Sequence, residues 1–452
     1  MSSNINLKRG LDIPISGIAA LRTGKQIVPD IVAIKPGDFK GFSPRLLVRE
    51  GDKVLAGSPV LADKQRPDIL ITSPVSGEVS EIVRGEKRKL LEIRIKADAG
   101  AGAVAFDVKN PSSMTSDELK QLLLKSGLWA ALIQRPYGII ADPDLSPKAI
   151  FISAFSTAPL AADNDFTLKD ELANIQTAVE ALSKLTKGGV HFSISKATSS
   201  SSPFHKVENV IQHVVSGKHP AGNVGIQIAN IAPIKKGETV WTVSLLMLAA
   251  IGRLLNTGKV NLSRKVAVTG PLAKDPCYVD AFPGMPMSAI ADFVDTTKGD
   301  VRYISGNVLT GTSVGSEGSL GFFDDQVTLI HEGTEREVLG WAKPFRTSQF
   351  SFSKAYFSWL FPKKKYDMDT NLHGGPRAFV VSDVYSKVLP ADIFPVYLIK
   401  ACLAGDIDKM EKFGIYEMLP EDLALCEFVD PSKNDIQSII QDGINLMIKE
   451  MA

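Results

Sequence analysis

The three cysteines of this sequence are the residues whose side chains could hold an iron-sulfur cluster or a structural metal. A cubane cluster takes a thiolate on each iron, and a cluster-binding run characteristically ends in Cys-x-x-x-Cys-Pro. The run from Cys426 through Asp430 to Pro431 keeps that frame, but aspartate stands where the second cysteine would be. It is equally explained by a chance cysteine and a proline that starts a helix. Because Cys277 and Cys402 form no Cys-x-x-Cys pair, the sequence predicts neither a cluster nor a structural zinc site.

Binding of a flavin or nucleotide phosphate depends on a glycine-rich turn between a strand and a helix. Glycines there permit a tight turn and let backbone amides reach the phosphate. The stretch 127–138, which follows a capped helix, has Trp129, Leu132 and Ile133 where such glycines would be required. Arg135 in the same stretch could meet an anion, although an arginine beside a proline is usually solvated or ion-paired. No Gly-x-Gly-x-x-Gly occurs in another strand-to-helix turn, so the sequence predicts no phosphate loop.

The spacing of histidines and serines gives no catalytic set. His205, His213 and His219 fall in one region, but no Asp/Glu spacing typical of zinc accompanies them. No serine stands in a Gly-x-Ser-x-Gly turn, since residues 315–319 read Gly-Ser-Glu-Gly-Ser. We therefore predict no catalytic, cofactor-binding or metal-binding residue in this chain.

Composition excludes several classes of function. The 51 basic and 50 acidic side chains leave a formal charge of +1, so no overall field favours nucleic acid or acidic substrates. The longest apolar run, 240–251, is shorter than the ~20 residues that a membrane-spanning helix needs. The first residues have no apolar stretch after their charges, so no signal peptide is predicted and we expect a cytoplasmic protein.

Short strands with tight turns are expected in the region 41–100. Gly51 and Gly57 have the spacing of turns that need positive φ, and the run Ser-Pro-Val-Ser-Gly at 73–77 supplies a crossing hairpin. This pattern resembles the biotinyl/lipoyl barrel-sandwich module, in which a lysine at a hairpin tip carries a swinging cofactor.

Lys64 lies near the position of that carrier lysine. A lipoyl-type carrier that acts through Lys64 is therefore one alternative. A structural use of the module is the other, because Pro67 denies the partner strand a hydrogen-bond donor close to the expected hairpin tip.

Strands and helices alternate from 110 to 257, after a small flexible linker near residue 100. A capping box at 115–118 opens the first helix. We then expect strands at 150–154, 190–194 and 224–228, and helices at 168–182, 207–214 and 240–251. Such alternation predicts a parallel sheet, and we predict a Rossmann-like α/β domain.

Short strands around one helix are expected in 258–335, a pattern that resembles the soluble-ligand-binding β-grasp (SLBB) domain. Those strands are predicted at 265–271, 301–306 and 308–311. The region 336–452 begins with strands and becomes helical, and the apolar stripe of its last helix, 435–451, is expected to face the core. With an N-terminal segment at 1–40, the predicted fold is a multidomain α/β protein with a C-terminal helical region.

This order of units resembles the flavin- and NADH-binding subunits of respiratory NADH dehydrogenases. More specific matches are six ordered stretches, at 13–17, 73–77, 158–163, 219–222, 239–242 and 420–426. On these stretches the chain is similar, over essentially its full length, to the A subunits of sodium-translocating NADH:quinone reductases. That family is related to the electron-input subunit of Rnf-type complexes.

The resemblance implies a bacterial six-subunit respiratory complex that moves electrons from NADH to ubiquinone or menaquinone and exports Na⁺. It implies that flavins, iron-sulfur centres and NADH are bound by other subunits. The chain itself would be a cofactor-free peripheral protein on the cytoplasmic side of the inner membrane, held chiefly against the membrane-embedded B subunit and near the quinone site. The alternatives are a stand-alone flavin- or nucleotide-binding reductase and the carrier that acts through Lys64.

An aromatic and basic stretch of the last region is the candidate docking site. Its rings and cations are Phe345, Phe350, Phe352, Tyr356, Phe357, Trp359, Phe361, Lys363, Lys364 and Lys365. Rings of this kind enter a membrane interface, and lysines meet lipid phosphates. We select as docking residues Phe357, Trp359, Phe361 and the three lysines. The alternative is a strand hairpin whose aromatic side chains fill the core while the lysines are solvated.

Overall fold

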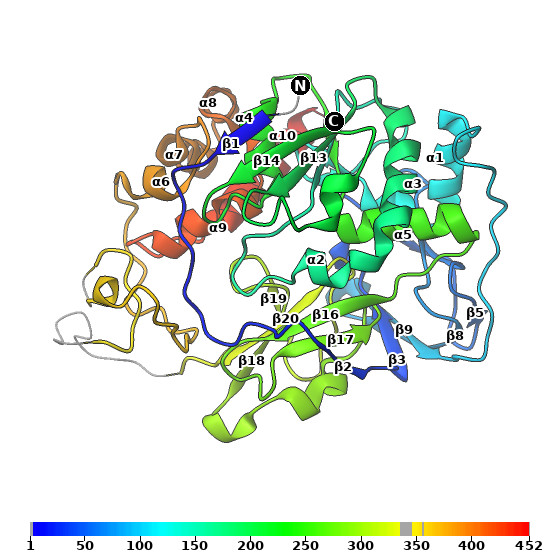
Figure 1. Cartoon of the computed structure of the whole chain (residues 1–452), viewed down its shortest axis with the longest axis horizontal. Coiled ribbons are helices and arrows are strands. Elements are labelled where there is room, and N and C mark those ends of the chain that lie inside the picture. The colour runs from blue at the N-terminus through cyan, green and yellow to red at the C-terminus, as the bar shows by residue number, and fades with distance from the viewer. Residues whose placement is uncertain (1–2, 335–345, 355–356, 452) are drawn as a thin grey trace.

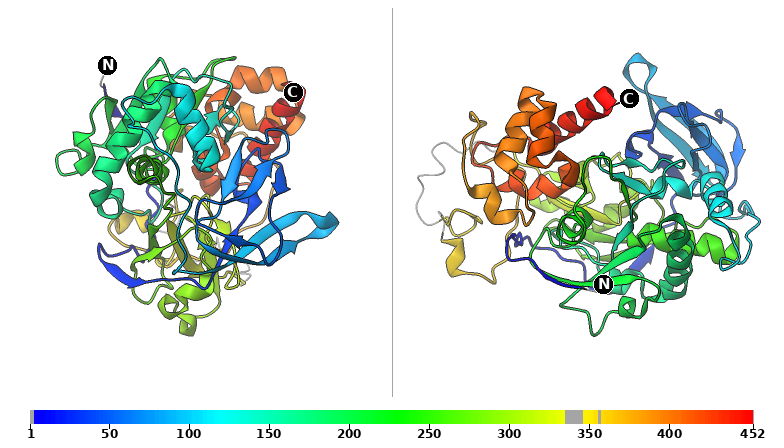
Figure 2. Two further views of the ribbon diagram at one scale, coloured as in Figure 1. Left: turned by 90° about the vertical axis from the view of Figure 1, so that its right-hand side faces the viewer. Right: turned by 90° about the horizontal axis from the view of Figure 1, so that it is seen from above.

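A computed structural model describes residues 3–334, 346–354 and 357–451 of the chain (Figure 1). Its architecture consists of four β-sheets and a C-terminal group of helices. Two small sheets lie at one end of the molecule and the C-terminal helices lie at the other, with the two larger sheets between them (Figures 1 and 2).

The two small antiparallel sheets are formed by residues 31–97. One has the strand order β3 (Ile31–Ile34), β9 (Leu90–Ala97), β8 (Gly77–Arg84) and β5 (Lys53–Val54), and the other has β4 (Pro44–Leu46), β6 (Pro59–Asp63) and β7 (Leu70–Thr72). Gly51 and Gly57 have φ angles of 89° and 92°, so the turns predicted at both glycines are confirmed. Val79, Ile93 and Ile95 are fully buried in the core of this region.

The largest sheet carries the α/β region. Its strand order is β1 (Ser3–Asn6), β14 (Ile211–Ser216), β13 (Val190–Ser195), β12 (Ile150–Ser153), β15 (Val240–Thr242), β10 (Ile133–Arg135) and β11 (Ile139–Ile140). The first five strands are parallel to one another, as the alternation predicts. Strand β10 runs antiparallel to both of its neighbours, β15 and β11. Ile150 packs with helices α3 (Leu172–Leu182) and α5 (Leu245–Thr257), whereas Phe151 packs with α4 (Val224–Ile231), so helices cover both faces.

The shorter helices of this region include the one predicted from its capping box. Helix α1 (Ser116–Lys125) begins at Thr115, whose hydroxyl accepts the N–H of Glu118, while the Glu118 carboxylate accepts the N–H of Thr115. The predicted capping box is therefore confirmed. A further short helix is α2 (Asn164–Thr167).

Three predicted elements of this sheet are wrong in type or extent. The stretch 207–214, predicted as a helix, leads into strand β14, where the polar His213 is buried and hides the alternation of a strand. The stretch 224–228, predicted as a strand, starts helix α4, where Gln227 is buried with its apolar neighbours, so the alternation marks no face. The stretch 240–251, predicted as one helix, contains strand β15 and the first part of α5.

The fourth sheet belongs to the predicted β-grasp region. Its strand order is β19 (Thr312–Ser313), β18 (Val301–Ser305), β20 (Gln326–His331), β16 (Arg264–Thr269), β17 (Cys277–Ala281) and β2 (Thr23–Gln26). The strands predicted at 265–271 and 301–306 are confirmed by β16 and β18. The strand predicted at 308–311 is wrong, because those residues form the turn that precedes β19.

The N-terminal residues contribute one strand to each of three sheets. Strand β1 pairs with β14, β2 pairs with β17, and β3 pairs with β9. Figure 1 shows the dark blue chain passing from β1 along the molecule to β2 and β3. This segment therefore connects the three β-containing regions through backbone hydrogen bonds.

The chain ends in a compact group of helices. They are α6 (Val384–Val388), α7 (Pro395–Ala404), α8 (Ile407–Phe413), α9 (Pro420–Val429) and α10 (Ile436–Met451). Along α10, Ile436, Ile440, Ile444 and Met447 are buried, so the prediction that its stripe faces the core is confirmed. The strands predicted before these helices are absent from the described residues 346–354 and 357–383, apart from isolated bridges. None of the helices in the described ranges is both long and apolar enough to cross a bilayer.

Candidate docking site

The selected docking residues lie in one exposed stretch, 357–365, which we call the docking segment. Phe357, Trp359 and Phe361 have 41%, 52% and 51% of their surface exposed. The exposed lysines that follow are Lys363, Lys364 and Lys365. A short 3-10 turn, Ser358–Leu360, lies between the first and the last of the three rings. The segment therefore presents apolar rings and cations on the same stretch of surface.

Both ends of the docking segment are held by hydrogen bonds. Tyr366 donates its backbone N–H to the carbonyl of Pro14 at 2.8 Å and accepts the N–H of Ser16 at 3.0 Å. Ser358 accepts the N–H of Ser351 on its hydroxyl at 3.2 Å and donates that hydroxyl to the Ser351 carbonyl at 3.3 Å. Because the flanking backbone is fixed, the exposed rings have a defined place on the surface.

Two further aromatic side chains of this stretch are described by the structure. Phe350 and Phe352 are half-buried, and the Phe350 ring lies 6.1 Å from that of Tyr366, measured between centroids. Phe345 and Tyr356 lie outside the described residues. The alternative of a hairpin whose rings fill the core is wrong for the three exposed rings of the docking segment. These three rings have the exposure that docking requires.

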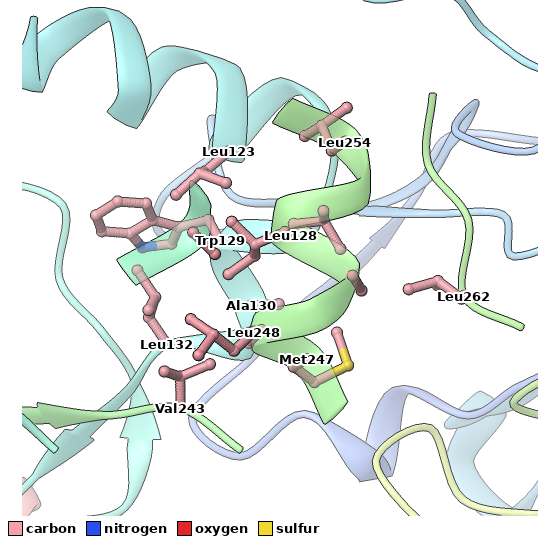
Figure 3. Packing of buried hydrophobic residues seen from close by; sticks show 14 of the residues in the cluster. Leu123, Leu128, Trp129, Ala130, Leu132, Val243, Met247, Leu248, Leu254 and Leu262 are labelled. Atoms are coloured by element: carbon pink, nitrogen blue, oxygen red, sulfur yellow. The ribbon is translucent and has the colours of Figure 1, made fainter. Parts of the chain in front are cut away.

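The stretch 127–138, predicted as the place of a missing phosphate loop, runs from the end of α1 into the antiparallel strand β10, so it is not a strand-to-helix turn and that placement is wrong. Its apolar side chains are part of the hydrophobic core. Trp129 is fully buried, donates its indole N–H to the Ala141 carbonyl at 2.7 Å and meets Trp241 edge to face. Figure 3 shows Leu128 and Leu132 gathered with Trp129 beside Met247 and Leu248 of α5. Side chains of this size occupy the space through which a phosphate would approach the backbone.

Arg135, at the end of β10, is buried and ion-paired. Its Nη1 lies 2.8 Å from Asp422 Oδ2 and its Nη2 lies 2.6 Å from Glu421 Oε1. The exposed fractions of the Arg135 and Asp422 side chains are 2% and 0%. Burial acts to lower the pKa of Arg135, but the two carboxylates outweigh it and raise the pKa. The guanidinium charge is thus neutralised within the chain.

Two local features hold this ion pair in place. Asp422 lies in the first turn of α9 and also accepts the N–H of Leu419 at 3.1 Å, which caps the helix. Gly225 lies in the first turn of α4, where an added Cβ would be 2.2 Å from both Arg135 Nη1 and Asp422 Oδ2. Sequence reasoning missed this contact because its partners are 287 residues apart. The carboxylates that follow Pro420 were its only local signal.

Asp430, which stands where the second cysteine of a cluster frame would be, has a structural role. Its carboxylate accepts hydrogen bonds from the Tyr385 hydroxyl at 2.9 Å and from the backbone N–H groups of Ser432 and Asn434 at 3.1 and 2.8 Å. Burial raises the pKa of Cys426, so its thiol is protonated at neutral pH. In the part of the chain that the structure describes, no three His, Cys, Asp or Glu side chains come together as metal ligands.

The hairpin that carries Lys64 is fixed to the α/β region. Lys64 is exposed, but the next residues are held: Asp63 Oδ1 accepts the N–H of Gln65 at 2.7 Å, and Arg66 pairs with Asp142 and Asp144 at 2.6 and 2.7 Å. A carrier lysine needs a hairpin tip free of contacts so that its cofactor can swing. The attachment of Arg66 therefore favours a structural use of this module.

Of the predicted histidines, His213 pairs with His191, and the buried ring of His219 has its Nδ1 3.3 Å from the Thr157 hydroxyl. His213 Nε2 lies 2.9 Å from His191 Nδ1, and His213 Nδ1 lies 2.7 Å from the Ser3 hydroxyl. Burial lowers the pKa of His191 and of His219 to about 4, so both rings are neutral at pH 7. This arrangement links β13, β14 and β1.

Three of the six stretches on which the resemblance rests, 13–17, 158–163 and 219–222, meet in space. Asp12, beside the stretch 13–17, accepts the N–H of His219 at 3.0 Å. Thr157, beside the stretch 158–163, accepts the N–H of Gly222 on its hydroxyl at 2.9 Å. These contacts place matched stretches from distant parts of the chain in one junction.

Family models match three parts of the chain. Residues 5–98 match the NqrA N-terminal barrel-sandwich hybrid domain, residues 114–260 match the NqrA second alpha/beta domain, and residues 265–316 match the NQRA C-terminal domain, of the SLBB type. The predicted barrel-sandwich and SLBB domains are therefore confirmed.

Curated relatives match the chain along its whole length. The A subunits of Na(+)-translocating NADH-quinone reductase from Yersinia pestis bv. Antiqua and from Alcanivorax borkumensis are each 36% identical over 99% of this chain and 100% of the relative. The protein of the same name from Rhodopirellula baltica is 34% identical over 98% of both chains. A solved NAD⁺-reducing [NiFe]-hydrogenase, 11% identical over 75% of this chain and 62% of its own with a TM-score of 0.37, is too dissimilar to carry an argument. On its relatives and its domains, the chain belongs to the family of the A subunits of Na(+)-translocating NADH-quinone reductase.

Proposed function

We propose that this chain is a cofactor-free structural and assembly subunit of a six-subunit respiratory complex that oxidises NADH, reduces quinone and exports Na⁺. The names of its relatives support the reaction of the complex. In this proposal the chain lies on the cytoplasmic side of the inner membrane, chiefly against the membrane-embedded B subunit and near the quinone site. Flavins, iron-sulfur centres and NADH are bound by other subunits, and the isolated chain does not catalyse the reaction.

The observation that carries the cofactor-free role is the closed core at 127–138. In a Rossmann-like domain, to which we assign the α/β region, a flavin phosphate needs glycines at the first strand-to-helix turn. The first such turn in this sheet is 154–163, between β12 and α2, and it contains no glycine. In the stretch 127–138, Trp129 and Leu132 are buried, and the nearby cation of Arg135 is neutralised by Asp422 and Glu421. A flavin bound at 127–138 would have to displace core side chains and break a buried ion pair.

The purified chain tests the absence of a flavin. We expect no stoichiometric flavin absorbance in the isolated protein, because the strand-to-helix turn 154–163 lacks the glycines of a phosphate loop and the stretch 127–138 is filled by core side chains. Absorbance spectra of the native protein and of its acid extract measure this directly. A flavin-bearing subunit from the same complex, purified alongside, is the positive control. One tightly bound flavin per chain would contradict the cofactor-free role and favour the stand-alone reductase.

Charge reversal in the docking segment tests the assembly role. We expect the variant Lys363→Glu, Lys364→Glu, Lys365→Glu to recover about tenfold less of the partner subunits from membranes, because like charges across an interface cost several kcal/mol and ~1.4 kcal/mol is already tenfold. Co-purification with a tagged chain is the measurement.

The matched control reverses three consecutive exposed cations outside the docking segment. These cations are Lys87, Arg88 and Lys89, in the turn between β8 and β9. They have no aromatic neighbours in sequence, and the turn lies at the sandwich end of the molecule. Unchanged recovery in the docking variant, or equal loss in both variants, would remove the assembly role of this segment.

A further inference from the structure

The stretch 346–366 differs from the rest of the chain in charge and in aromatic content. It contains five Lys or Arg residues and no Asp or Glu, although the whole chain is balanced to within one charge. Seven of its 21 residues are aromatic, whereas aromatic residues make up 7% of the chain. Cations and rings are therefore concentrated here without neutralising carboxylates in the same stretch.

The exposed apolar side chains and lysines of this stretch lie close together in the structure. Trp359, Leu360 and Phe361 are each about half exposed, and the lysines at 363–365 follow within two residues. The segment lies at the helical end of the molecule, away from the sandwich domain, in Figure 1 and in the right-hand view of Figure 2. Rings that remain exposed in a folded chain lose contact with water only when another surface covers them.

We propose that the docking segment binds an anionic lipid bilayer directly, with Trp359 and Phe361 in the headgroup interface and Lys363, Lys364 and Lys365 on lipid phosphates. Tryptophan and phenylalanine suit the boundary between headgroups and acyl chains, and lysines near an anionic leaflet each add to the attraction. A second copy of the chain is a poorer occupant, since the same patch would place lysine against lysine. This inference rests on the proposed attachment to a membrane complex and names the bilayer as the ligand of that site.

Vesicle binding by the isolated full-length chain tests the inference without any partner subunit. Vesicles of phosphatidylcholine with phosphatidylglycerol in equal amounts are compared with vesicles of phosphatidylcholine alone in a flotation assay. We expect binding to the anionic vesicles, weakening as salt is raised, and little binding to the neutral ones. Equal binding to both kinds of vesicle would overturn the role of the lysines.

Variants separate the contributions of cations and rings. Replacing Lys363, Lys364 and Lys365 with glutamine is expected to weaken binding to the anionic vesicles by about 100-fold. Each lysine contributes a factor of roughly five, and the three factors multiply. The pair Lys363→Gln and Lys365→Gln spares Lys364, whose ammonium bonds to the Thr347 carbonyl, so a folded variant is available. Trp359→Ala with Phe361→Ala is expected to weaken binding while leaving its salt dependence. The triple Lys87→Gln, Arg88→Gln, Lys89→Gln is the matched control and should bind as the parent protein does.

The co-purification experiment distinguishes this inference from the proposed function. Loss of partner subunits in the lysine-to-glutamate variant, together with no vesicle binding by the parent chain, would show that the segment contacts protein, and the lipid inference would fail alone. Vesicle binding that depends on the lysines, together with intact assembly in the variant, would support the lipid inference and remove the assembly role. If the control triple lost as much vesicle binding as the lysine-to-glutamine triple, the docking segment would not be a specific lipid-binding surface.

Discussion

Replacing Asp422 with alanine is expected to lower the free energy of unfolding by about 3–5 kcal/mol, because a buried guanidinium loses its fully buried partner. Arg135 and Asp422 are almost completely buried, and Arg135 Nε already has no hydrogen-bond partner in the described structure. The substitution also removes the acceptor for the N–H of Leu419 at the start of α9. Urea unfolding of parent and variant, followed by circular dichroism, measures the change.

The neighbouring carboxylate supplies the control for this prediction. Glu421 has 43% of its side chain exposed, so Glu421→Gln is expected to cost less than about 1 kcal/mol. The double variant Arg135→Met with Asp422→Leu should recover most of the loss, because apolar side chains replace a buried pair and the only charge left without its partner is that of Glu421, which is 43% exposed. An Asp422→Ala variant as stable as Glu421→Gln would show that water reaches Arg135 and that the pair is not a structural link.

Replacing Trp129 with alanine is expected to lower the free energy of unfolding by about 3–5 kcal/mol, the range for a large aromatic side chain removed from a core. Trp129 is fully buried, contacts Trp241 edge to face with ring centroids 5.4 Å apart, and donates its indole N–H to Ala141. Alanine would leave a cavity and an unpaired carbonyl beside α5. The same urea unfolding experiment measures the effect.

Trp359 is the matched control, because it is the same residue type in an exposed position. Trp359→Ala should change the free energy of unfolding by about 0.5 kcal/mol or less. If both tryptophan variants lost equal stability, Trp129 would not be a core residue, and the stretch 127–138 would be free to rearrange around a phosphate. The pair of variants therefore tests the closed core on which the cofactor-free role depends.

Local structure could be predicted from the sequence at positions where few residue types fit the backbone conformation. The positive φ at Gly51 and Gly57, the capping box at Thr115 and the apolar stripe of α10 are each specified within a few residues. The loss of cofactor motifs was read in the same way, from tryptophan and leucine in place of glycine and from aspartate in place of cysteine. These patterns specify the sandwich turns and predict that the usual ligands of redox groups are missing.

Contacts between distant residues were not readable in this way. Strand β14 and helix α4 were assigned the wrong type because burial of His213 and Gln227 depends on neighbouring strands and helices, which no local pattern reports. The partner of Arg135 was unknown for the same reason.

The sequence by itself determined the order of the units, their turns and caps, and the family to which the chain is similar. Only the tertiary structure decided which charges are neutralised inside and which rings remain outside. The same residue type, tryptophan, is core at 129 and exposed at 359. The physical reason is that burial depends on which surfaces the rest of the chain brings together, and a linear pattern of side chains does not contain that information.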